Sequence, residues 1–204
     1  MTQILARLAA LNLLALAAAF TAGLISFFSG GLTRLDLPWW ELHFYLGLGS
    51  TLLTLGVHCL VFVYFLGTGR WVKEVALAYG IPDDPLPKLT RQLKRWTYPV
   101  ALAAMLLPIA AALAGAKVQG REWHWSIHFT LGLATLLVNA WAFVVEYRNV
   151  KINAEVLDRV LAEVDRIRAE YGLPSNAEAL AEEERTNQAQ KEGKSEKDKD
   201  RRPV

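Results

Sequence analysis

The sequence predicts an all-α integral membrane protein built around a bundle of four transmembrane helices. Three observations support this: four uncharged apolar runs, a weak internal repeat and a sharp change in charge density. Residues 1–149 carry 18 of the 42 charged side chains, and the last 55 residues carry the other 24. We therefore expect a four-span membrane domain over 1–149, a cytoplasmic amphipathic helix over 150–174 and a disordered charged tail over 175–204.

Each of the four uncharged runs is long enough to cross a bilayer as a helix. They extend from Leu8 to Thr33, from Leu42 to Gly69, from Trp96 to Ala116 and from Trp123 to Val145. A hydrocarbon core of about 30 Å needs about 20 apolar residues, and the backbone amides there must bond within their own element. We expect spans at about 8–30, 42–67, 96–115 and 123–146, with a cytoplasmic loop over 68–95. The first run is longer than the about 7–15 apolar residues of a signal peptide, so it is expected to remain as a span.

The distribution of Lys and Arg predicts that both termini are cytoplasmic. Nine of these residues lie near the span ends on one side, and three, Arg34, Lys117 and Arg121, lie on the other. The basic-rich side of a membrane protein is normally the cytoplasmic side. We expect the inner or plasma membrane if the source is bacterial. The basic residues before the third span are expected to contact anionic membrane lipid; they are Lys88, Arg91, Lys94 and Arg95.

A weak internal repeat suggests two tandem helical hairpins. The sequence HFYLGL begins at His43, and HFTLGL begins at His128, so five of six positions match at an offset of 85. Further along, Val57-His58 matches Val138-Asn139, and YGIP at Tyr79 resembles YGLP at Tyr171. Gly followed by Pro is a common helix stop. Two parallel copies would be related by a twofold axis along the membrane normal, which can bring equivalent residues to one central site.

His43 and His128 are the candidate ligands of a b-type haem. They occupy equivalent positions at the outer ends of two parallel spans, and two imidazoles from facing helices can hold a haem iron axially. Gly47 and Gly132 lie one turn below them, where glycine allows close approach of a macrocycle or of another helix.

Two alternatives for these histidines remain open. His124 is one turn before His128, so His43, His124 and His128 could form a metal or quinone site near the outer face. All three could instead be hydrogen-bonding residues of the interfacial aromatic belt.

His58 lies deeper in its span than a belt residue would. Its repeat counterpart is Asn139, which predicts a His–Asn hydrogen bond between the second and fourth spans. A role for His58 as a buried ligand or proton relay is the alternative. Because asparagine is a poor haem ligand, the sequence supports one bis-histidine haem and not two.

The sequence contains no enzyme signature and no strongly basic face for nucleic acid. Its one cysteine excludes a disulfide framework and a CxxC metal site.

Residues 152–171 are expected to pair as a short coiled coil, because their apolar side chains follow helical spacing at Leu157, Val160, Val164 and Ile167. The partner would be the matching helix of the middle loop, a second copy or another subunit. The leading hypothesis is therefore a small non-catalytic membrane subunit of a larger assembly, and the alternatives are a one-haem electron-transfer protein and a histidine-based metal or quinone site.

Overall fold

The computed structural model describes residues 1–29 and 38–200, and this part of the chain contains five α-helices and no strand. They are α1 (Thr2–Phe28), α2 (Pro38–Tyr79), α3 (Leu86–Gln119), α4 (Trp125–Glu170) and α5 (Asn176–Asp200). The first four are long and apolar enough to cross a membrane. The structure thus supports an all-α integral membrane protein. Arg34, the predicted end of the first span at residue 30 and the last four residues of the predicted tail lie outside the described residues.

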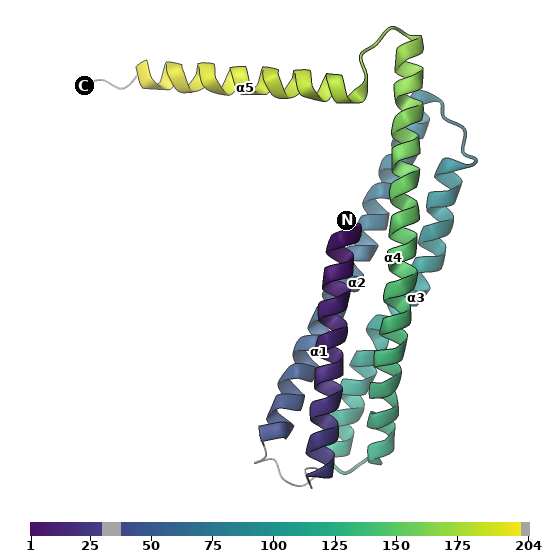
Figure 1. Cartoon of the computed structure of the whole chain (residues 1–204), viewed down its shortest axis with the longest axis vertical. Coiled ribbons are helices and arrows are strands. Elements are labelled where there is room, and N and C mark those ends of the chain that lie inside the picture. The colour runs from purple at the N-terminus through teal and green to yellow at the C-terminus, as the bar shows by residue number, and fades with distance from the viewer. Residues whose placement is uncertain (30–37, 201–204) are drawn as a thin grey trace.

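The four long helices form a bundle in which α2 and α4 face each other (Figure 1). α1 packs against α2 and α4, and α3 packs against the same two helices. α2 and α4 also contact each other across the bundle axis, whereas the described parts of α1 and α3 do not meet. All four histidines lie on α2 or α4 or cap α4, so the topology places them at the bundle centre or at its ends.

α2 and α4 continue as helices well beyond the predicted ends of their spans. The first part of the predicted 68–95 loop is the last part of α2, and the predicted separate helix at 150–174 is the continuation of α4. Neither extension contains a proline, and the single glycine at position 69 does not interrupt α2. The helix ends that the two Tyr-Gly-x-Pro sequences predicted are confirmed, because Gly80 and Gly172 follow the ends of α2 and α4 with left-handed φ angles of 66° and 67°.

The extensions of α2 and α4 pack against each other and form a hydrophobic core of their own. Its buried side chains are Val72, Ala76 and Ile81 from one half and Val156, Val160 and Val164 from the other. The sequence left three possible partners for residues 152–171. In the structure, this segment packs against one of them, the helical first part of the middle loop. The amphipathic face is therefore covered within the chain.

Replacing Val160 with aspartate is expected to open this extension without dissolving the bundle. Val160 is fully buried, and an unpaired carboxylate in an apolar site costs several kcal/mol. Amide hydrogen exchange should therefore speed up over residues 70–79 and 150–170 and stay slow at the bundle centre. The control is Leu161→Asp, because Leu161 is 38% exposed. Equal exchange in the two variants would contradict the intramolecular pairing.

The structure differs from the predicted disordered tail, because residues 176–200 form α5. Figure 1 shows this helix leaving the end of α4 and extending away from the bundle. A start signal was present in the sequence: Ser175 and Glu178 form a capping box, in which the Glu178 carboxylate accepts from the Ser175 N–H at 2.8 Å and the Ser175 hydroxyl accepts from the Glu178 N–H at 3.3 Å. Alanine, glutamate, glutamine and lysine, which are strong helix formers, fill much of the segment.

Candidate functional site

His43 on α2 and His128 on α4 lie together at one end of the bundle, which we call the histidine end. Their ring centroids are 5.8 Å apart, and the ring planes are nearly perpendicular at 77°. Both side chains are half-buried. The structure therefore brings together the two residues that the repeat predicted to converge.

Each of these rings is held by a backbone carbonyl of the neighbouring helix. His43 Nδ1 donates to the Ala19 carbonyl of α1 at 2.8 Å, and His128 Nδ1 donates to the Ala111 carbonyl of α3 at 2.8 Å. A carbonyl oxygen only accepts, so the proton of each neutral imidazole is on Nδ1 and the lone pair is on Nε2. This arrangement, with one nitrogen anchored and the other available, is typical of metal-ligating histidines.

Gly23 and Gly115 allow the two rings to lie against the neighbouring helices. A Cβ atom at Gly23 would be 2.8 Å from the His43 ring, and one at Gly115 would be 3.0 Å from the His128 ring. Neither glycine was singled out from the sequence. A signal was available, because each lies four residues after its carbonyl acceptor, and Ala-x-x-Ala-Gly occurs at both places.

Replacing Gly23 with alanine is expected to destabilise the protein by about 1–3 kcal/mol, the usual cost of overpacking. The added methyl group would push the His43 ring off its carbonyl partner. The measurement is unfolding in detergent. Gly49→Ala is the matched control, because a Cβ there meets no atom within 4 Å and the substitution should be neutral or stabilising. If both variants lose the same stability, the contact with the ring is not the cause.

The predicted glycine positions below the two histidines differ from each other. A Cβ at Gly132 would meet the Phe20 ring of α1 at 3.5 Å, so this glycine lies where two helices approach closely. A Cβ at Gly47 would meet nothing within 4 Å. Gly132 thus fits the helix-packing explanation, and Gly47 leaves open space one turn below His43.

His124 does not join the other two histidines. It is the exposed N-cap of α4, and its Nδ1 atom lies 2.8 Å from the Ser126 hydroxyl and accepts from the Ser126 N–H at 3.4 Å. Across residues 1–29 and 38–191, no three His, Cys, Asp or Glu side chains gather in a way that could hold a metal ion. The structure therefore does not assemble the predicted site of three histidines.

His58 lies in a fully buried polar cluster between α2 and α4. Its Nε2 atom is 3.0 Å from Asn139 Oδ1, which confirms the predicted hydrogen bond. Its Nδ1 atom is 2.6 Å from Oε1 of Glu146, a partner that the sequence did not suggest. The signal was the seven-residue spacing of Asn139, Glu146 and Asn153, which places three polar side chains on one helix face. All three are fully buried.

The hydrogen bonds around Asn139 determine which atoms of this cluster carry protons. Its amide Nδ2 donates to the carbonyls of Thr135 at 2.9 Å and Ala104 at 3.2 Å, so Oδ1 faces His58 and accepts from Nε2–H. A single proton is then shared between His58 Nδ1 and Glu146. The pair is neutral as a unit, either as imidazolium with carboxylate or as imidazole with carboxylic acid. Both ring nitrogens of His58 are engaged, so His58 has no lone pair free for a metal ion.

No family model matches the chain, and neither a curated protein nor a solved structure matches it.

Proposed function

We propose that the protein is a membrane electron-transfer protein that binds one haem b between His43 and His128. The observation that carries the proposal is the matched pair of imidazoles on facing helices. Each is anchored at Nδ1 by a carbonyl and keeps Nε2 available as a ligand. Axial ligation by two histidines inside a helix bundle suits a six-coordinate iron that carries electrons.

The number of converging ligands favours haem over a bare metal ion. A structural zinc site needs four protein ligands and a catalytic one needs three. Among the residues whose side chains the structure describes, no three His, Cys, Asp or Glu side chains gather, and the histidine end offers the pair His43 and His128. A haem iron needs no more than these two from the protein, because its macrocycle occupies the remaining positions. The haem would supply the one-electron chemistry, while the protein orients the two ligands.

The carbonyl and glycine contacts would be the chain's own contribution to the site. A hydrogen bond from Nδ1–H to a carbonyl fixes the ring orientation and makes Nε2 more basic. The Ala19 and Ala111 carbonyls supply this bond on both sides, and Gly23 and Gly115 let each ring reach it. The same set of contacts in both halves supports the view that the two hairpins are tandem repeats of one unit.

Two features support a single haem. The deeper position of the repeat holds His58 on α2 but Asn139 on α4, and the two are hydrogen-bonded to each other. His58 is also bonded to Glu146, so that neither ring nitrogen remains for iron. We propose that this inner cluster joins α2 to α4 and holds the bundle centre in place.

An electron carrier requires a donor and an acceptor, so the proposal includes a place in a larger membrane assembly. The chain would serve there as a small subunit without catalysis of its own, with both termini in the cytoplasm as the charge distribution predicts. The amphipathic face at 152–171 is covered by the chain itself, so it supports no specific partner.

An absorption spectrum of the full chain, expressed with ample haem and solubilised in detergent, tests the proposal. We expect a Soret band, a haem-to-protein ratio near one and the narrow visible bands of a six-coordinate b-type haem after reduction. A colourless protein that is folded and helical under these conditions would contradict the proposal.

A further inference from the structure

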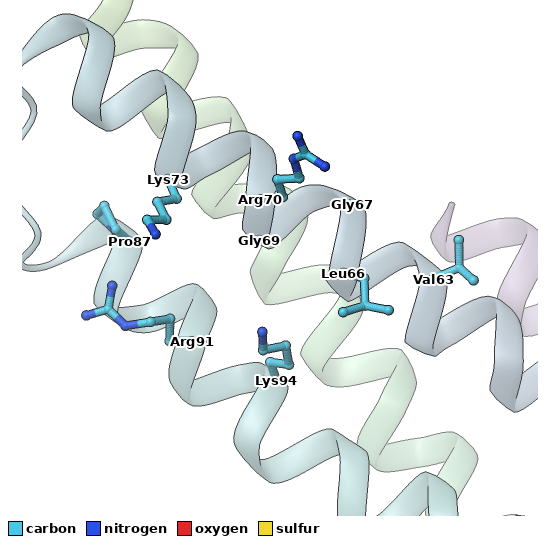
Figure 2. A pocket seen from close by; sticks show the side chains of 9 residues that line it. All are labelled: Val63, Leu66, Gly67, Gly69, Arg70, Lys73, Pro87, Arg91 and Lys94. Carbon is cyan, nitrogen blue, oxygen red and sulfur yellow. The ribbon is translucent and has the colours of Figure 1, made fainter.

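A groove with mixed basic and apolar walls lies between α2 and α3, at the end of the bundle opposite the histidine end. It has a volume of about 650 Å³. The apolar part of its lining includes Val63 and Leu66, and its basic side chains are Arg70, Lys73, Arg91 and Lys94. Figure 2 shows Lys73 extending from α2 toward α3 and Lys94 extending from α3 toward α2, while Arg70 is directed away from the gap.

The two lysines carry charge that nearby acids do not offset. Arg70 is paired with Glu74 at 2.8 Å, and Arg91 donates to both carboxylate oxygens of Asp83. The Arg91 guanidinium lowers the pKa of the Asp83 carboxyl below its usual range, so this acid is ionised at neutral pH and balances the arginine. Neither Lys73 nor Lys94 has an ion-pair partner within the described part of the chain. The groove therefore has a surplus of two positive charges.

The groove also crosses the boundary between the apolar and charged parts of the chain. Val63 and Leu66 belong to the second uncharged run, which ends at Gly69, whereas Lys73 and Lys94 lie outside the uncharged runs. A ligand that fills the groove would place an apolar end among the spans and an anionic end at the lysines. Gly67 lies between the two regions, and a Cβ there would meet no atom within 4 Å.

We propose that this groove binds an anionic phospholipid. The phosphate of its headgroup would lie at Lys73 and Lys94, and the part of an acyl chain nearest the headgroup would lie along Val63 and Leu66. A soluble phosphate would use only the basic half of the groove, whereas a phospholipid uses both halves. Each lysine near an anionic lipid surface strengthens attraction by about fivefold. The proposal is independent of haem, since the groove lies at the other end of the bundle.

The experiment is native mass spectrometry of the full chain, released from mixed micelles of phosphatidylglycerol and phosphatidylcholine with identical acyl chains. We expect the protein to retain phosphatidylglycerol in preference to phosphatidylcholine. Lys73→Gln with Lys94→Gln should lower this preference by about 25-fold, which is the product of the two lysine contributions. Gly67→Phe leaves every charge in place but fills the groove, and it should also lower the retention.

The matched control is Arg148→Gln with Lys151→Gln, which removes two exposed positive charges from α4 near the end of its uncharged run. The control should keep the preference. The proposal is overturned if the control loses as much as the lysine pair, because general surface charge would then explain the binding. It is also overturned if the lysine pair or Gly67→Phe binds like the unmodified chain. Displacement of the lipid by millimolar inorganic phosphate would assign the groove to free phosphate instead.

Discussion

Replacing either His43 or His128 with alanine is expected to remove the haem from the protein, with the Soret absorbance per protein falling more than tenfold. Each substitution would delete one of the two proposed haem ligands, and changes that only disturb the outer partners of a ligand already cost about 10–100-fold in affinity. Both rings are half-buried and neither lies in the hydrophobic cores, so the bundle itself should stay folded. The measurements are the absorption spectrum and circular dichroism of the same samples.

Two further variants separate ligation from a structural role. His124→Ala is the control, because His124 caps α4 outside the site, and its spectrum should be unchanged. His128→Met replaces one ligand by another that haem iron accepts, so it should retain haem and raise the reduction potential. An unchanged Soret band in both alanine variants would show that the haem is held elsewhere in the protein.

Replacing Glu146 with alanine is expected to destabilise the protein by about 3–5 kcal/mol, the usual cost of removing one partner of a buried ion pair. The substitution leaves His58 fully buried with its Nδ1 atom unpaired and creates a cavity beside the His58 ring, on which Phe143 stacks at a centroid distance of 4.9 Å. Denaturant-induced unfolding in detergent measures the loss. Glu155→Ala, an exposed change on the same helix, is the control and should be close to neutral.

Two further variants test whether His58 and Glu146 share one proton. Glu146→Gln can donate an amide hydrogen to His58 Nδ1 while His58 Nε2–H still bonds to Asn139, so we expect a much smaller loss than with alanine. Replacing His58 and Glu146 together with leucine removes both polar groups and should also cost less than Glu146→Ala alone. Glu146→Gln being as destabilising as Glu146→Ala would show that a full negative charge is required at this position.

Several features were predictable because they depend on neighbouring residues and on the surrounding solvent. Hydrocarbon excludes charge and unpaired backbone amides, so four uncharged runs of sufficient length already predicted four helices. The left-handed glycines at 80 and 172 end their helices locally, as the two Tyr-Gly-x-Pro sequences indicated. The convergence of His43 and His128 and the bond between His58 and Asn139 followed from matching the two halves of the chain.

Other features depended on how the helices are rotated against one another, which no single run of residues specifies. Glu146 is one residue beyond its uncharged run, and only the packing of α2 against α4 shows that it is buried against His58. The same packing extends both helices past the spans, because their apolar faces cover each other. It also distinguishes Gly23 and Gly115, where an added Cβ would meet a histidine ring, from Gly47, where an added Cβ would meet no atom within 4 Å. Local chemistry therefore decided which segments are helices and which residues are polar within them, whereas the relative rotation of the helices decided which of those residues meet.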